Sequence, residues 1–152
     1  MKLYLSAPPT PLFKNAITIT GSKSESNRLL LLKAIYPEIH IKNVSNSDDA
    51  EVMQKGLRTV QGEVDIHHAG TAMRFLTAYF ASQEGKKVIL TGSQRMTERP
   101  IKVLVDALRD LGADISYVKN EGYPPIAIQG KTLHNHKVSS VSYTHLTLPT
   151  KA

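Results

Sequence analysis

Lysine, serine and arginine side chains gather in the segment G-S-K-S-E-S-N-R, which runs from Gly21 to Arg28 at a predicted strand-to-helix junction. The first turn of a helix leaves backbone N–H groups unpaired and lies at the positive end of the helix dipole, so it attracts phosphate or carboxylate. Lys23 adds a point charge, Ser24 adds a hydroxyl, and Arg28 lies one turn further along the same face. The segment predicts an anion site, although capping serines with solvated charges would give the same pattern. A P-loop is excluded, because the order of Gly, Lys and Ser does not match.

Two further segments suggest anion binding. In H-A-G-T-A-M-R, His68 to Arg74, Gly70 permits close approach of the backbone to a ligand at a helix start. In R-M-T-E-R-P-I, Arg99 immediately precedes Pro100, which we expect to open a helix. A cation there adds to the positive helix end, which is unfavourable unless an anion is bound. The alternative is an exposed arginine paired with a nearby carboxylate, from Glu98 or Asp106.

Composition narrows the function classes. The chain of 152 residues has no cysteine, and its six histidines include no pair at zinc-site helix spacing, so we expect no metal site. The net charge of +6 is spread along the chain, which argues against a nucleic-acid arm or a polybasic membrane patch and suits small anionic ligands. With no apolar run long enough to cross a bilayer and no secretory signal, we expect a cytoplasmic protein. The adjacent Asp48 and Asp49 are interpreted as helix N-caps, not as catalytic groups.

The elements that must position these residues alternate between strand and helix. Strands are expected at residues 16–20, 39–44, 64–66, 87–91, 113–118 and 126–129, and helices at 24–36, 50–60, 71–82 and from 100 to about 111. This alternation predicts the α/β class. Gly21 and Gly70 each follow an expected strand and precede an apolar helix, a faint sign of an internal repeat. Residues 141–152 lack sustained periodicity, and we expect an unrelated read-through tail there.

Together the motifs resemble one family, the enolpyruvyl transferases that act on shikimate 3-phosphate. The resemblance rests on six ordered motifs across residues 1–140, namely G-S-K-S-E-S-N-R, S-D-D, A-G-T-A-M-R, R-M-T-E-R-P-I-K-V-L-V-D-A-L, Y-P-P and V-S-S. It implies transfer of the enolpyruvyl group of phosphoenolpyruvate to the 5-hydroxyl of shikimate 3-phosphate, with release of phosphate and without a cofactor. It also implies a fold of two domains built from repeated βαβαββ units, with about two of the first domain's three units present here.

The resemblance assigns roles to individual residues. It implies that Lys23 is catalytic and contacts both substrates, and that Ser24 and Arg28 contact the carboxylate of the shikimate. The phosphoenolpyruvate site, which glyphosate also occupies in the family, would be formed by Gly70, Arg99 and His68, the last standing where many members have Asn. Ser139 and Ser140 match the serines that hold the 3-phosphate. Glyphosate sensitivity cannot be assumed, because Phe75 stands where Pro is frequent.

The resemblance also limits what the chain can do. Residues 1–20 would pack on a second domain, and the family's catalytic Asp, Glu and Lys lie beyond residue 140, so the chain is expected to be inactive alone; the intact enzyme would be a monomer. Two alternatives remain open. One is the sister family that transfers enolpyruvyl to UDP-N-acetylglucosamine, which typically carries a cysteine that this chain lacks. The other is a non-catalytic anion-binding domain.

Overall fold

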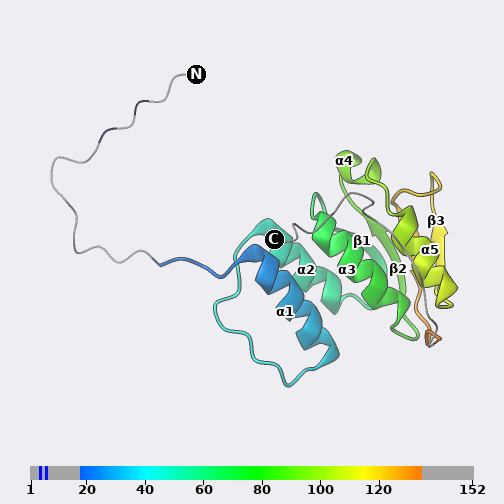
Figure 1. The fold of residues 1–152 in the computed structure, drawn as a ribbon, viewed down its shortest axis with the longest axis horizontal. Helices are drawn as coiled ribbons and strands as arrows, with labels where there is room; N and C mark the ends of the chain where they lie inside the picture. Colours follow the sequence, from blue (N-terminus) through cyan, green and yellow to red (C-terminus); the bar gives the residue numbers. More distant parts are fainter. Residues whose placement is uncertain (1–3, 5, 7–17, 135–152) are drawn as a thin grey trace, which may run out of the picture.

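The computed structural model describes residues 4, 6 and 18–134, and these form nine helices and strands (Figure 1). In chain order they are α1 (Lys23–Ile35), α2 (Asp48–Arg58), β1 (Gln61–Asp65), α3 (Gly70–Ala81), β2 (Lys87–Thr91), α4 (Gln94–Thr97), α5 (Lys102–Asp110), β3 (Asp114–Tyr117) and β4 (Ile126–Gln129). The predicted α/β class is confirmed. None of the helices in the described ranges is long and apolar enough to span a membrane.

The four strands form one mixed sheet in the order β1-β2-β4-β3. β1 and β2 are parallel, with Gln61 opposite Lys87, and helix α3 makes the crossover that a parallel pair requires. β4 pairs antiparallel with both β2 and β3, so it lies between strands that come before it in the chain. The sheet therefore brings the ends of β1 and β2, and the loops that follow them, side by side.

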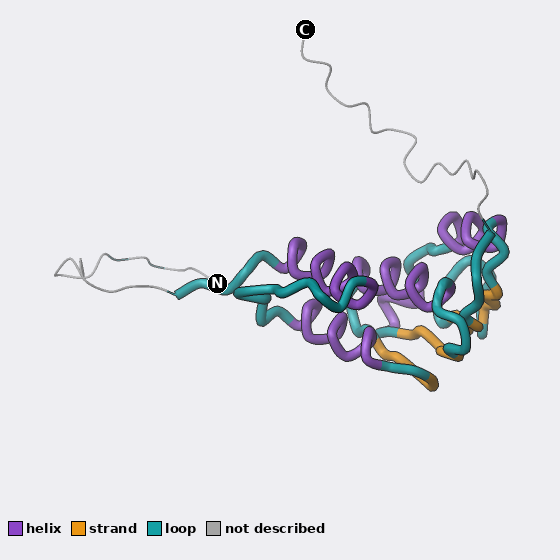
Figure 2. Tube along the Cα trace, turned by 90° about the horizontal axis from the view of Figure 1, so that it is seen from below, coloured by secondary structure: helices purple, strands orange, loops and turns teal. Residues whose placement is uncertain are grey.

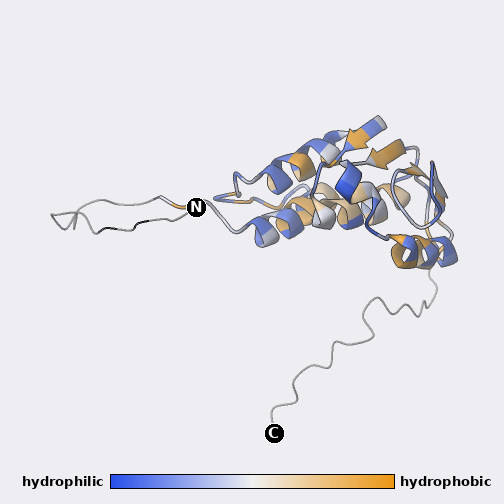
Figure 3. Ribbon diagram, turned by 90° about the horizontal axis from the view of Figure 1, so that it is seen from above, coloured by the Kyte–Doolittle hydropathy of each residue, from blue (hydrophilic) through white to orange (hydrophobic). Residues whose placement is uncertain are grey.

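The helices cover one face of this sheet (Figure 2). Alternate strand residues such as Val64, Leu90 and Ile128 are buried toward the helices, while Ile89 on the other face is 38% exposed. Helix α3 lies at the centre of the core, and its Leu76 and Phe80 are fully buried. Helix α5 carries hydrophobic residues (orange) and hydrophilic residues (blue) on different sides, as Figure 3 shows. This is expected for a helix that covers a core.

Several helix predictions are confirmed in type and corrected at their ends. Ser22 is the N-cap of α1, and its side chain accepts from the Glu25 backbone N–H at 3.5 Å, which is the hydrogen bond of a capping serine. Helix α2 begins earlier than expected: its N-cap is Ser47, and the predicted N-caps Asp48 and Asp49 are instead the first two helical residues. Acidic side chains are favourable there because they face the positive helix end.

Helix α5 does not begin at Pro100. Ile101 is its N-cap, with φ −127°, and the Ile101 backbone N–H donates to the carbonyl of Gly122 at 2.8 Å. With φ −127° and ψ 1°, Ile101 is not helical, and the first helical residue is Lys102. The predicted end is confirmed, since Gly112 follows the helix at φ +93°, where glycine is favoured. The short helix α4, capped by Ser93, was not predicted.

The strand predictions at 87–91 and 126–129 are confirmed, and those at 64–66 and 113–118 are correct in place. The prediction at 39–44 is wrong: these residues pair with no strand in the described ranges, and Asn43 has φ +54°. Residues 18–20 of the strand expected at 16–20 are not in a strand either, and 16 and 17 lie outside the described residues. Apolar alternation alone does not make a strand, because a strand needs a hydrogen-bonding partner.

One βαβαββ unit is visible between β1 and β4, if the short helix α4 is set aside. Before it, residues 18–60 contribute the two helices α1 and α2 and no strand, so a second unit is not seen in the described part of the chain. The prediction of two repeated units stays a prediction.

Candidate anion-binding site

The start of α1 holds the first predicted cluster. Arg28 Nη1 donates to the Ser24 backbone carbonyl at 2.7 Å and to Ser24 Oγ at 2.5 Å, which fixes the guanidinium back along the helix. The guanidinium carbon also lies 5.7 Å from the centre of the Phe75 ring on α3, within cation–π range. Phe75 therefore contributes to holding Arg28, a contact between α1 and α3 that the sequence does not reveal.

The counter-ion of Lys23 is Asp49, which the sequence analysis interpreted as a helix N-cap. Lys23 Nζ lies 3.5 Å from Asp49 Oδ2, with the lysine side chain 56% exposed and the aspartate 25% exposed. Asp49 thus balances the charge of Lys23 across the α1–α2 interface instead of capping α2. Because the pair faces solvent, an incoming anion can compete with it.

The start of α3 brings the second and third clusters together. A Cβ placed on Gly70 would lie 2.5 Å from Nη1 and 3.0 Å from Cζ of Arg99, so the guanidinium rests directly against the glycine backbone. A close backbone approach at Gly70 was predicted, although the approaching group here is Arg99 of the same chain. The first turn of α3 and a guanidinium therefore meet at one point, which is the arrangement expected for an oxyanion.

Arg74 ties these two segments together. Its Nη1 donates to the Gly70 carbonyl at 3.1 Å, and its Nη2 approaches the Pro100 carbonyl at 3.5 Å. One side chain thus joins the first residue of α3 to the residue that follows Arg99. This role was missed in the sequence, because it depends on a contact across 26 positions.

A cavity of about 450 Å³ opens beside Arg99 and is lined by His68, Arg95, Met96 and Arg99. We call it the cationic pocket, since none of these four residues carries a carboxylate. The alternative that Arg99 is neutralised by Glu98 or Asp106 is not supported. Within the described ranges, Asp106 pairs with Lys102 and Arg109, and no ion pair involves Arg99. Arg95 was not singled out in the sequence; it stands next to Met96 on the unpredicted helix α4.

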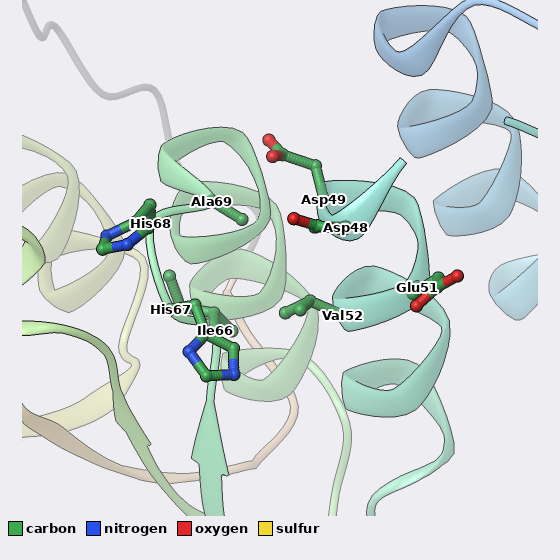
Figure 4. Close-up of a pocket in the computed structure, with 8 residues that line it drawn as sticks. All are labelled: Asp48, Asp49, Glu51, Val52, Ile66, His67, His68 and Ala69. Atoms are coloured by element: carbon green, nitrogen blue, oxygen red, sulfur yellow. The ribbon is translucent and has the colours of Figure 1, made fainter. Parts of the chain in front are cut away.

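A second cavity of about 450 Å³ also has His68 in its lining (Figure 4). We call it the acidic pocket, and it is lined by Asp48, Asp49, Glu51, Val52, Ile66, His67, His68 and Ala69. In Figure 4 the His68 ring is directed away from Asp48 and Asp49. Since Asp49 also pairs with Lys23, this pocket connects the start of α1 with the start of α3.

Two of the predicted substrate-binding residues cannot be placed relative to this site. Ser139 and Ser140, predicted to hold a phosphate, lie outside the described residues. As for metals, residues 4, 6 and 18–134 contain no group of three or more His, Cys, Asp or Glu side chains arranged to hold an ion. The structure thus places Arg28 with Ser24, Lys23 with Asp49, and Gly70 with Arg99 and His68.

Known proteins with similar sequences belong to the family that the motifs resemble. The family model of EPSP synthase (3-phosphoshikimate 1-carboxyvinyltransferase) matches residues 61–148. A 3-phosphoshikimate 1-carboxyvinyltransferase from Bacteroides fragilis is 46% identical over 140 residues, which cover 91% of this chain and 33% of that protein. The corresponding protein of Mannheimia haemolytica is 37% identical, over 94% of this chain and 40% of its own. This chain therefore spans about a third of the length of the relatives that it matches.

The fold has solved counterparts. An EPSP synthase structure from Acinetobacter baumannii superposes with a TM-score of 0.63 and 22% identity, covering 75% of this chain and 31% of that one. At this identity the likeness supports the fold alone, but the family model matches more than half of the chain. The six ordered motifs, the sheet with its helices on one face and the family match agree, and the chain belongs to the EPSP synthase family.

Proposed function

We propose that this chain carries part of the substrate-binding apparatus of a 3-phosphoshikimate 1-carboxyvinyltransferase. The relatives that share 37–46% identity bear this name, which favours shikimate 3-phosphate over a UDP-linked sugar as the acceptor. In the proposed reaction, the 5-hydroxyl of shikimate 3-phosphate attacks phosphoenolpyruvate after protonation of its methylene carbon, and phosphate is then eliminated. The chain's contribution is to hold two anions close together.

The observation that carries the proposal is the contact of Arg99 with Gly70 at the start of α3, beside a cavity that contains a second arginine and a histidine. A guanidinium offers two parallel donors to a phosphate, and the helix start adds backbone N–H groups. We assign the phosphate of phosphoenolpyruvate to the cationic pocket, with Arg99, Gly70 and His68 as its binding residues.

The start of α1 supplies the second half of the proposed site. Arg28, fixed by Ser24, has donors for the carboxylate of shikimate 3-phosphate. Lys23 lies between the two anions in this proposal and exchanges its partner Asp49 for substrate. Ser139 and Ser140 are proposed to hold the 3-phosphate.

The proposed division of the chain follows the prediction from sequence. Residues 1–140 would belong to a first domain, with 1–20 packed on a second one. Residues 141–152 would be an unrelated tail, although the family model's match runs on to residue 148. Because the family's proton-transfer groups are expected outside this chain, residues 1–152 should bind anions and release no phosphate. The complete enzyme is proposed to act as a cytoplasmic monomer without nucleic acid or membrane partners.

A titration of the 152-residue chain with inorganic phosphate tests the binding role. The Nε–H resonance of Arg99 should shift with saturation, and Arg99→Gln should weaken phosphate binding about tenfold, since a charged hydrogen bond contributes about 1.5–3 kcal/mol. Arg58→Gln is the matched control, because Arg58 is also an exposed arginine but lies at the end of α2. An equal loss of phosphate affinity in both variants would show that any exposed positive charge contributes to binding, and it would contradict the proposal.

A second assay tests the catalytic role. Phosphoenolpyruvate and shikimate 3-phosphate are incubated with the 152-residue chain, and free phosphate is measured. No release above a protein-free control is expected. Sustained turnover would mean that residues 1–152 contain the proton-transfer groups, and the proposed division of labour would be wrong.

A further inference from the structure

His68 makes one hydrogen bond that no assigned role explains. Its Nδ1 lies 2.7 Å from Oγ of Ser93, which is the N-cap of α4. Either atom could be the donor: a neutral imidazole carries one N–H and one bare nitrogen, and a hydroxyl can donate one hydrogen and accept two. The choice matters because it decides whether Nε2, the other ring nitrogen of His68, carries a hydrogen.

The surroundings of Ser93 favour one choice. Its Oγ already accepts from the Met96 backbone N–H at 3.4 Å, as an N-cap oxygen does. The hydroxyl hydrogen, in contrast, has no other acceptor among the hydrogen bonds of residues 4, 6 and 18–134. If Ser93 Oγ donates to His68 Nδ1, both the oxygen and the hydrogen of the hydroxyl have partners. The oxygen accepts from the Met96 N–H and caps the helix, and the hydrogen is donated to an unprotonated nitrogen.

From this geometry we infer that Ser93 is a positioning residue that holds His68 in the tautomer with the hydrogen on Nε2. This inference rests on the proposed function, since it gives the imidazole its task in the cationic pocket. In this tautomer neutral His68 donates from Nε2 to an oxygen of the phosphate. In the opposite tautomer Nε2 would present a lone pair to the anion, which is repulsive.

The backbone of Ser93 holds the His68 loop without help from the Ser93 hydroxyl, so the hydroxyl can be removed without disturbing the fold. The Ser93 backbone N–H donates to the His67 carbonyl at 3.0 Å, so the loop that carries His68 is held independently of the hydroxyl. Gly92 permits this approach, since a Cβ there would lie 2.7 Å from the same carbonyl. Removal of the hydroxyl therefore frees the His68 ring while the loop stays in place.

The tautomer can be read directly from the 152-residue chain by two-bond 1H–15N correlation of the imidazole ring, at a pH above the ordinary histidine pKa of about 6.5. His68 is assigned by the loss of its signals in His68→Asn. We expect the hydrogen on Nε2 in the unchanged chain and in Ser93→Thr, which keeps a hydroxyl. Ser93→Ala should give a mixture of both forms. A hydrogen on Nδ1 in the unchanged chain overturns the inference.

Phosphate affinity gives a second readout. If Ser93→Ala lowers the fraction of the competent tautomer to between a half and a fifth, the apparent Kd for phosphate rises about two- to fivefold. Loss of the N-cap could also move Arg95 and Arg99, so the change is repeated in His68→Asn, where no tautomer exists. Ser93→Ala should then have no effect on phosphate affinity. An undiminished effect would show that Ser93 acts through the helix and not through His68.

The two readouts separate this inference from the proposed function. If phosphate fails to bind while the hydrogen is on Nε2, the assignment of the pocket falls and the role of Ser93 in fixing the tautomer stands. If phosphate binds while the hydrogen is on Nδ1, the pocket stands and the role of Ser93 falls.

Discussion

Gly70→Ala is the most direct perturbation of the candidate site. The new Cβ would lie 2.5 Å from Nη1 of Arg99, and an ordinary contact between such atoms is about 3.5 Å. The guanidinium must therefore move by about 1 Å. This movement is easy, because Arg99 is exposed and its side chain is flexible. The fold should tolerate the change, and alanine even has a better helix propensity than glycine, by up to about 1 kcal/mol.

The same movement should impair binding. A guanidinium displaced by about 1 Å can no longer share an oxyanion with the backbone N–H groups at the start of α3, because hydrogen bonds weaken beyond about 3.2 Å. The loss of one charged hydrogen bond, about 1.5–3 kcal/mol, corresponds to roughly ten- to a hundredfold. Since the pocket is open to water, we expect the lower end, about a tenfold weaker affinity for phosphate.

Two measurements on the 152-residue chain check this prediction: phosphate titration followed at the Arg99 Nε–H resonance, and unfolding by urea. The matched control is Gly56→Ala in α2, where a Cβ would lie 2.6 Å from Cδ1 of the buried Leu76. Overpacking of this kind costs about 1–3 kcal/mol. The control should therefore lose stability and keep its phosphate affinity when folded. Unchanged phosphate binding by Gly70→Ala would refute the importance of the close approach.

Three other predictions concern the charge pairs and the core. Asp49→Asn should free Lys23 and strengthen phosphate binding at the start of α1 about two- to threefold, with a stability change under about 1 kcal/mol, because the pair is exposed; amide shifts at that helix start during the titration measure it, and unchanged affinity would contradict it. The pKa of Glu121 is lowered, mainly by the hydrogen bond from Lys102 at 2.8 Å. Its stabilising effect is thus present near neutral pH and is lost as pH falls through that lowered pKa. Glu121→Gln should consequently shift the urea midpoint slightly at pH 7 and not in acid below that lowered pKa, and an equal shift at both pH values would disprove the link. Phe80→Ala removes a fully buried ring and should cost about 3–5 kcal/mol, which circular dichroism on heating would detect as a large fall in Tm; a Tm within a few degrees of the unchanged chain would argue against this core.

Local sequence signals were sufficient where an element is defined by its own residues. Helix α1 follows from the Ser22 cap and an apolar run, and strand β2 has the predicted bounds. The signals failed where a distant residue decides the local conformation. The N–H of Ile101, the N-cap of α5, is bonded to the distant carbonyl of Gly122, and residues 39–44 find no partner strand within the described ranges. Neither outcome is visible in a short window of sequence.

The candidate site follows the same rule. The predicted residues Gly70 and Arg99 do meet, because the loop that carries Arg99 lies against the start of α3. Arg74, Ser93 and Asp49 were missed as supporting residues. Their partners lie 25 or more positions away, or on a neighbouring helix, so only the folded chain brings them together.

The open cationic pocket also explains why this chain should bind small anions weakly. Two unit charges about 4 Å apart attract by about 1 kcal/mol in bulk water and by about 4 kcal/mol at the effective dielectric constant of a partly buried protein site. Arg95 and Arg99 are both exposed here, so they act near the first limit. Exposure also lets the chain tolerate unpaired cations at a helix start, because water screens their repulsion. In the proposed complete enzyme, a covering domain that excludes water would strengthen both the attraction of the arginines for an anion and their repulsion by the helix start. The bound anion would then offset this repulsion, which is weak in the solvent-exposed pocket of this chain.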